Sequence, residues 1–312
     1  MSLIKKASEL NINGKIKCLI YGQAGMGKTT FAISSPKPLL FDFDNGVHRV
    51  NYNHLQGVDT VQIESYQNFV DVLNNEDLTP YETLVIDTGG KLLDYMGDYI
   101  VKNNPNMGRA NRMLTLQGYG ERKSTFSDLV KKISIMGKHI VFVAHRETKT
   151  EGDDTRYVPQ FGGSNYDSLV TELDLVGYME ANGRDRTITF DPTSRNDGKN
   201  TCNLPSVIKI PVILDAKGQP TTDNDYMEQH VIKPYYARLE DRKKAGEEYN
   251  NLIVEIQTDI NGIVTVESAN EFITNIGDWE HVGNSKLAAS KMLSKKAKDL
   301  GFTFNKETKC YE

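Results

Sequence analysis

Nine residues near the start of the chain have the types and spacing that bind phosphate. The first eight match the P-loop pattern G-x-x-x-x-G-K-[ST]. Backbone N–H groups can surround a polyphosphate only where the chain wraps tightly without Cβ atoms in the way, and glycines supply that freedom. The pattern therefore predicts a nucleoside triphosphate site. The residues expected to bind the nucleotide are Gly22, Gln23, Ala24, Gly25, Met26, Gly27, Lys28, Thr29 and Thr30.

Two side chains at the end of this loop have distinct expected roles. Lys28 is expected to be solvated and to reach the β- and γ-phosphates as a point charge, while the Thr29 hydroxyl ligates the Mg²⁺ ion that bridges them. The pattern predicts a strand over 15–21 and a helix over 29–34. This order of strand, loop and helix is the context that the motif requires, because a helix N-terminus favours anions.

Further along the chain, a carboxylate follows an apolar segment. Residues 83–87 predict a strand with Asp87 at its tip, the Walker B arrangement, in which Asp87 orients the shell of Thr29, magnesium and water. Many P-loop motors carry a catalytic glutamate directly after this aspartate, but here Thr88 follows. The general base must therefore come from elsewhere in the chain.

The remaining pattern predicts alternating strands and helices. The fold class expected is α/β, a mostly parallel, doubly wound sheet flanked by helices. Residues 147–164 are polar and predict a loop beside the active-site edge. Further strands are predicted over 39–44, 139–145, 187–190 and 207–213, and helices from Ser65, over 89–102 and over 125–135.

The domain boundary is expected near Asp215. Residues 1–214 would form the nucleotide-binding core, 215–224 a linker rich in turn residues, and 225–312 a mainly helical C-terminal region. Asn284 can begin a helix with Lys291, Lys295 and Lys298 along one face. That lysine stripe is either a phosphate-tracking surface or an ordinary solvated face.

Composition limits the class of protein. Of 312 residues, 38% are hydrophobic and 25% charged, which is typical of a globular domain with no membrane span. The net charge of −5 excludes a globally basic nucleic-acid binder, although residues 284–312 carry seven lysines against three acidic residues. Three widely spaced cysteines signal neither a disulfide framework nor a zinc site, so a cytoplasmic location is expected.

The order of these motifs over about residues 4–213 resembles the RecA-like recombination ATPases, and most closely the AAA-type phage ATPases that assist single-strand annealing. The resemblance implies ATP and Mg²⁺ as cofactors. It places the catalytic carboxylate at Asp44, where the family usually has glutamate, with Asp42 as the alternative. It makes His145 the polar sensor at a strand end, although a purely structural histidine is the competing interpretation. The catalytic residues expected are thus Lys28, Asp44, Asp87 and His145, and the metal ligands Thr29 and Asp87.

The same resemblance implies partners. Residues 147–163 would contact single-stranded DNA, with Arg146, Lys149, Arg156 and the C-terminal lysine helix as contacts, and an annealing or single-strand-binding protein as a further partner. A homo-oligomer is expected, because in this superfamily a neighbouring subunit often completes the site with a basic residue. The candidates for that residue are Arg184, Arg186, Arg195 and Lys199.

Three functions remain open from the sequence. The leading one is a DNA-stimulated ATPase of recombination or replication. The second is a GTPase, because residues 87–90 satisfy D-x-x-G, although 305–308 fail the guanine motif N-K-x-D at its fourth place. The third is a nucleotide-gated scaffold that binds ATP, barely hydrolyses it and recruits an annealing or single-strand-binding protein.

Overall fold

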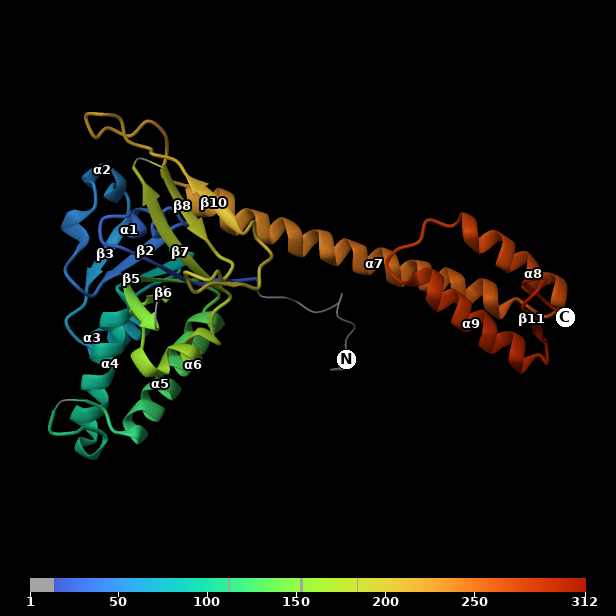
Figure 1. Ribbon diagram of the computed structural model, residues 1–312, viewed down its shortest axis with the longest axis horizontal. Helices are drawn as coiled ribbons and strands as arrows, with labels where there is room; N and C mark the ends of the chain where they lie inside the picture. The colour runs from blue at the N-terminus through green and yellow to red at the C-terminus, as the bar shows by residue number, and fades with distance from the viewer. Residues whose placement is uncertain (1–13, 112, 152–153, 184) are drawn as a thin grey trace. The chain divides into compact units, whose positions relative to one another are not determined.

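The computed structural model describes residues 14–111, 113–151, 154–183 and 185–312 (Figure 1). Contacts divide the chain into one unit that runs to Tyr236 and another that begins at Ala237. This division lies after the boundary expected near Asp215. The segment expected as a linker instead folds back on itself, because Leu214 forms a β-bridge with Pro220 and the Asn224 side chain donates to the Thr30 carbonyl at 2.9 Å.

The first unit is built on one sheet with the strand order β10-β8-β7-β1-β5-β4-β2-β3. Neighbours from β3 to β7 along this order are parallel, and the strands beyond β7 are antiparallel. The expected α/β fold class, with a mostly parallel sheet flanked by helices, is confirmed. The strands are β1 Lys17–Gly22, β2 Pro38–Asp42, β3 Asp59–Gln62, β4 Thr83–Asp87, β5 His139–Glu151, β6 Asp154–Pro159, β7 Leu175–Asn182, β8 Asp185–Thr189, β9 Lys199–Asn200 and β10 Val207–Ile210.

Both faces of this sheet are buried, which explains why its strands are almost continuously apolar. In β1, Leu19 and Tyr21 face one core while Cys18 and Ile20 face the other, as the alternation of a strand requires. The helices of the first core are α3 Tyr66–Asn75, α4 Gly89–Asn103, α5 Leu116–Ile135 and α6 Tyr166–Val170 (Figure 1). Those of the second are α1 Lys28–Ala32, the π-helix η5 Glu228–Ile232 and the start of α7 Lys233–Asn261. Short helices are η2 Val47–Arg49, α2 Tyr52–Leu55, η3 Pro105–Met107 and η4 Gly163–Asn165.

The structure corrects the loop predicted over 147–164. β5 continues to Glu151 and pairs with β6 in an antiparallel hairpin, from Arg146 opposite Pro159 to Glu151 opposite Asp154. Residues 147–150 are exposed, so this part of the hairpin buries little apolar surface and lacks the hydrophobic pattern of a core strand. Helix α5 also begins earlier than the predicted 125, because the Thr115 hydroxyl caps it by accepting from Gly118 N–H at 3.2 Å.

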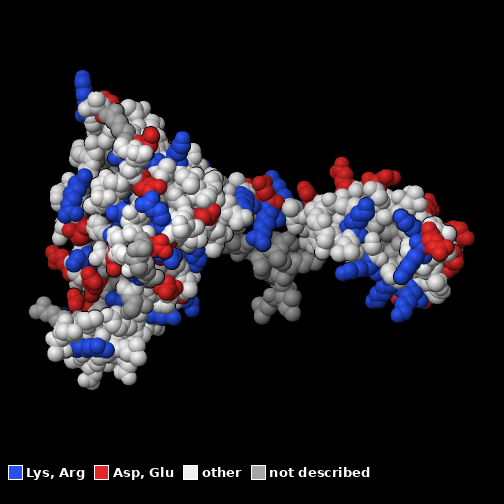
Figure 2. Space-filling model, in the orientation of Figure 1, with Lys and Arg blue, Asp and Glu red and all other residues white. Residues whose placement is uncertain are grey.

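The second unit is mainly helical, as expected, and has its own core. Ile256, Phe272, Leu293 and Tyr311 are among its buried side chains. On the face shown in Figure 2, its basic and acidic side chains gather in separate groups. Besides the end of α7, the unit comprises α8 Val266–Asn275, η6 Ile276–Asp278, α9 Ser285–Asp299, β11 Phe304–Asn305 and β12 Cys310–Tyr311.

The predicted lysine helix is α9. Ala289, Leu293 and Ala297 are buried, while Lys291, Lys295 and Lys298 are all exposed. The three lysines therefore form a stripe on the side turned away from the core. None of the helices in the described residues is both long and apolar enough to span a membrane.

Candidate active site

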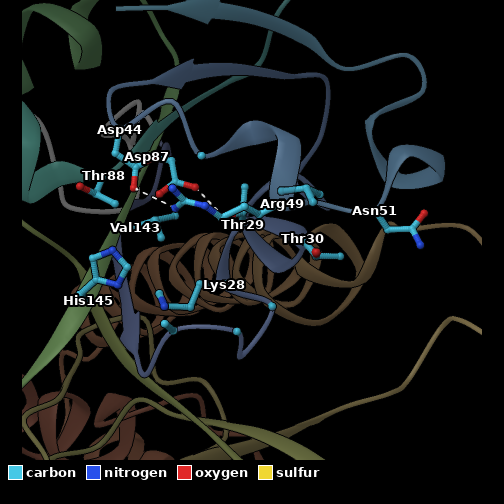
Figure 3. A pocket seen from close by; sticks show the side chains of 15 residues that line it. Lys28, Thr29, Thr30, Asp44, Arg49, Asn51, Asp87, Thr88, Val143 and His145 are labelled. Carbon is cyan, nitrogen blue, oxygen red and sulfur yellow. Dashed lines mark hydrogen bonds and ion pairs between the residues drawn. The ribbon is translucent and has the colours of Figure 1, made fainter. Parts of the chain in front are cut away.

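The sequence-predicted chemistry converges on one cleft of about 290 Å³ at the carboxyl ends of the parallel strands (Figure 3). The register explains the convergence, because Gly22 lies opposite His145, and Asp87 lies between Asp42 and Val143 on the neighbouring strands. Ligands of open α/β sheets bind at this edge. The cleft is lined by Ala24, Gly25, Gly27, Lys28, Thr29, Thr30, Asp44, Gly46, Arg49, Val50, Asn51, Asp87, Thr88, Val143 and His145.

The P-loop glycines serve two different purposes. Gly25 and Gly27 have positive φ angles of 78° and 85°, the left-handed conformation that the tight wrap requires. Gly22 is the last residue of β1, and a Cβ there would lie 2.3 Å from the Met179 carbonyl oxygen of β7. Gly22 therefore allows the strands to pack below the loop rather than lining the cleft.

Lys28 is buried, with 6% of its surface exposed, which corrects the expectation of a solvated lysine. It is the first residue of α1, and its Nζ donates to the Gln23 carbonyl across the loop at 2.8 Å. Burial lowers its pKa, while Asp87 and Asp44 act in the opposite direction. The lysine is therefore held inside the loop as a fixed charge facing two carboxylates.

Thr29 and Asp87 meet directly. The Thr29 hydroxyl donates to Asp87 Oδ2 at 2.6 Å, joining the P-loop helix to β4. Burial raises the pKa of Asp87 to about 6; the bond from Thr29 opposes the shift and the nearby Asp44 adds to it. A buried carboxylate that is costly to ionise is suited to a cation, and two oxygen ligands fit Mg²⁺, which keeps several waters and phosphate oxygens in its shell. These two residues therefore fit the predicted metal site.

The two candidate carboxylates after β2 occupy different positions. Asp42 is 2% exposed, and its oxygens accept from Gly46 N–H at 2.9 Å and Val47 N–H at 3.1 Å. Asp42 thus holds the turn that follows the strand. Asp44, in that turn, lines the cleft, where it can face a bound phosphate. The geometry favours Asp44 over Asp42 as the residue available to water.

His145 also lines the cleft, half-buried, from β5 (Figure 3). Burial lowers its pKa, and the positive charges of Lys28 and Arg49 lower it further, against the effect of Asp44. These effects favour the neutral imidazole, in which one ring nitrogen donates a hydrogen bond and the other accepts one. The next residue, Arg146, leaves the cleft and stacks on the Tyr157 ring of the hairpin, 4.2 Å from its centroid.

The sequence analysis did not single out Arg49, Val50 and Asn51 as cleft residues. Arg49 lies 3.7 Å from Asp44, Nη1 to Oδ2, and brings a second positive charge beside Lys28. No local sequence pattern marks it, because a basic residue that follows a strand end is usually solvated. Thr88, in the place of a catalytic glutamate, caps α4 by accepting from Lys91 N–H at 3.3 Å.

The basic residues expected to act in a neighbouring subunit have partners within this chain where they are described. Arg186 donates to the Met26 carbonyl at 3.1 Å, so it supports the P-loop of its own chain. Arg195 stacks on Tyr157, and Lys199 donates to the Val170 and Thr171 carbonyls. Arg184 lies outside the described residues.

The AAA domain family matches residues 14–202, a stretch that contains the P-loop, Asp44, Asp87 and His145. The chain belongs to the AAA domain family. With its assembled P-loop, this AAA domain is a P-loop NTPase domain. A search of curated proteins found no match.

Two of the solved structures that are similar to this AAA domain protein are a KaiC-like protein and a DnaB-like replicative helicase. A KaiC-like protein from the hyperthermophilic archaeon Pyrococcus horikoshii is 14% identical, with a TM-score of 0.35, over 56% of this chain and 77% of that one. A DnaB-like replicative helicase, described with its interactions with primase, is 10% identical, with a TM-score of 0.39. That match covers 64% of this chain and 55% of the helicase chain.

Proposed function

We propose that this protein is a Mg²⁺-dependent ATPase of phage-type DNA recombination or replication that binds single-stranded DNA and assists annealing. The observation that carries the proposal is the 2.6 Å bond between Thr29 and Asp87, with Lys28 and Asp44 lining the same cleft. Phosphoryl transfer depends on positioning and charge stabilisation, and these four groups supply both. A homo-oligomer in the cytoplasm of a host cell is part of this proposal.

Each residue has a role in the proposed hydrolysis. Thr29 and Asp87 would hold Mg²⁺, which neutralises charge on the β- and γ-phosphates when bound. Lys28 and the backbone N–H groups of the P-loop bind the phosphates. Asp44 accepts a proton from the water that attacks the γ-phosphorus, and His145 contacts the γ-phosphate region as a neutral polar group.

Structural reasons account for the D-x-x-G match without guanine chemistry. A Cβ at Gly89 would lie 2.6 Å from the Phe161 ring, and one at Gly90 would lie 2.8 Å from the Gln160 carbonyl oxygen. Both glycines therefore allow the end of the hairpin to pack on α4. Asn305 is occupied in a turn, where its Oδ1 accepts from Glu307 and Thr308 N–H. We therefore propose ATP rather than GTP as the substrate.

The proposed DNA contacts differ in how available they are. Lys149 is exposed on the hairpin, and Lys291, Lys295 and Lys298 are exposed on α9. Arg156 is paired with Asp197 at 2.5 Å, so its charge is already offset. The lysines are therefore expected to contribute more to phosphate binding than Arg156, and Arg146 is expected to act through its stack with Tyr157.

Two observations keep the nucleotide-gated scaffold as the second candidate. No glutamate follows Asp87, and Asp44 is ion-paired with Arg49. A site with a restrained base can bind ATP and turn it over slowly.

Phosphate release from ATP, measured with and without single-stranded DNA, tests these candidates together. The proposal predicts Mg²⁺-dependent hydrolysis that DNA stimulates, and stronger use of ATP than of GTP. ATP binding with negligible hydrolysis, and no response to DNA, would favour the scaffold. For about three to five neutralised phosphates, log affinity for DNA against log salt should slope at roughly −2 to −3.5.

A further inference from the structure

Arg49 occupies a position that the proposed mechanism does not use. It ends the short helix η2, lines the same cleft as Lys28, and has a side chain that is 64% exposed. Its Nη1 lies 3.7 Å from Asp44 Oδ2. The guanidinium thus contacts the carboxylate proposed as the base, from within the same chain.

Hydrogen bonds to Asp42 hold the backbone of the turn that carries Asp44 and leads to Arg49. Asp42 accepts from the backbone of Gly46 and Val47, and a Cβ at Gly46 would lie 2.5 Å from Asp44 Oδ1 and 3.2 Å from Arg49 Nη1. The Asp44 and Arg49 side chains therefore lie directly against Gly46, and a side chain at that position would displace them. Because the backbone is held, only the Arg49 side chain needs to move to change its partner.

The Asp44–Arg49 pair is suited to exchange. An ion pair this exposed contributes little stability, so another anion can replace the carboxylate without a large cost. A γ-phosphate offers more negative charge and two oxygens that match the planar fork of arginine. Lys28 is directed to the Gln23 carbonyl inside the loop, whereas Arg49 approaches the cleft from the turn after β2.

We propose that Arg49 is a γ-phosphate sensor supplied in cis, which pairs with Asp44 when the site is empty and transfers to the γ-phosphate when ATP binds. The inference rests on the proposed ATPase function. The transfer frees the Asp44 carboxylate as the attacking water forms its bond to the γ-phosphorus. The bond from the γ-phosphorus to the bridging oxygen breaks, ADP leaves, and the water proton passes to Asp44. ADP lacks the γ-phosphate and leaves the Asp44–Arg49 pair intact.

Equilibrium binding of Mg²⁺-ADP and of the β,γ-imido analogue of ATP separates this role from a general charge effect. Arg49→Ala should weaken binding of the analogue about tenfold or more, as loss of a charge-assisted hydrogen bond does, and change ADP binding less than about threefold. Arg49→Lys should restore part of the discrimination. Arg109→Ala removes an exposed arginine that does not line the cleft and should change neither affinity.

The Asp44→Asn variant provides a second test of the sensor role. Removing the carboxylate releases Arg49, so affinity for the analogue should rise a few-fold, and this gain should vanish in the Asp44→Asn, Arg49→Ala double variant. Equal losses for ADP and the analogue in Arg49→Ala, or a gain that persists in the double variant, would overturn the sensor role. Failure of the ATPase proposal would instead appear in the wild-type protein, as an absence of ATP hydrolysis.

Discussion

The Thr29 hydroxyl, on the helix that follows β1, and the Asp87 carboxylate, at the end of β4, are hydrogen-bonded at 2.6 Å, although β5 lies between β1 and β4 in the sheet. This bond joins the P-loop helix to the end of β4. Burial raises the Asp87 pKa, and the bond from Thr29 opposes that shift by favouring the ionised carboxylate.

Magnesium-dependent nucleotide binding should weaken below about pH 6. Burial raises the pKa of Asp87 to about 6, and the metal binds only the ionised carboxylate, so below that pH the metal must displace a proton to bind. The apparent affinity for Mg²⁺-ATP should drop by roughly tenfold per pH unit below this point. Calorimetric titration from pH 7.5 to 5 checks this, with Asp87→Asn as the control. That variant should bind weakly and without the same pH dependence.

Replacing Lys28 by methionine should reduce ATP turnover at least about a hundredfold, because a fixed charge on the phosphates is lost. The protein should remain folded, since burial already disfavours the charge on Lys28 and methionine fills similar space. Phosphate-release assays and thermal melts measure the two effects. Full activity in Lys28→Met would show that the P-loop is not the catalytic site.

Asp44→Asn and Asp42→Asn should fail in different ways. Asp44→Asn should lower hydrolysis about a hundredfold or more without unfolding the protein, because a base acts in the transition state. Asp42→Asn should lower the free energy of unfolding by about 1–3 kcal/mol. Two backbone N–H groups donate to the two oxygens of Asp42, and in the variant the amide NH₂ would face one of these donors. Chemical denaturation and turnover distinguish the variants. The reverse pattern would place the base at Asp42.

His139 should make the first unit sensitive to acid. It is buried, its Nδ1 accepts from Ile16 N–H at 3.0 Å, and its Nε2 lies 3.0 Å from the Tyr236 hydroxyl. Burial lowers its pKa to about 4, so the unfolded state binds the proton first as pH falls below 6.5. Stability due to neutral His139 is therefore complete above pH 6.5 and is lost towards pH 4, by up to about 3 kcal/mol.

The raised pKa of Asp87 acts oppositely, because the folded state then holds a proton that the unfolded state releases. Denaturant unfolding of the wild type and of His139→Gln over this pH range isolates the histidine, since Asp87 contributes to both proteins. The variant should lose less stability between pH 6.5 and 4. Identical pH dependence in the two proteins would contradict the role of His139.

The parts that could be predicted from the sequence are those specified by local pattern. The P-loop is a contiguous motif, and Asp87 ends an apolar segment, so their positions at the ends of two strands followed from spacing alone. Arg49 could not be found in this way, because an exposed arginine in a turn resembles any solvated residue. Its position depends on Asp42 folding the turn back, a contact that no periodicity records.

The hydrophobic pattern of the sequence also could not predict the β5–β6 hairpin or the point where the chain divides into two units. Residues 147–150 are exposed, so no alternation marks them as strand. The turn-rich segment around Gly218 resembles a linker, but its carbonyl accepts from the Asn51 and Asn53 side chains, which attaches it to the first unit. Turn residues mark where a chain reverses, and contacts determine whether a unit ends there.

The most direct test is ATP hydrolysis measured over a range of Mg²⁺ concentrations in the wild type, Thr29→Ser and Thr29→Ala. If Thr29 and Asp87 hold the metal, Thr29→Ser should behave like the wild type, and Thr29→Ala should have its largest defect when magnesium is limiting. Hydrolysis that does not depend on Mg²⁺, or equal activity in Thr29→Ala at every concentration, would contradict a magnesium ATPase built on these two residues.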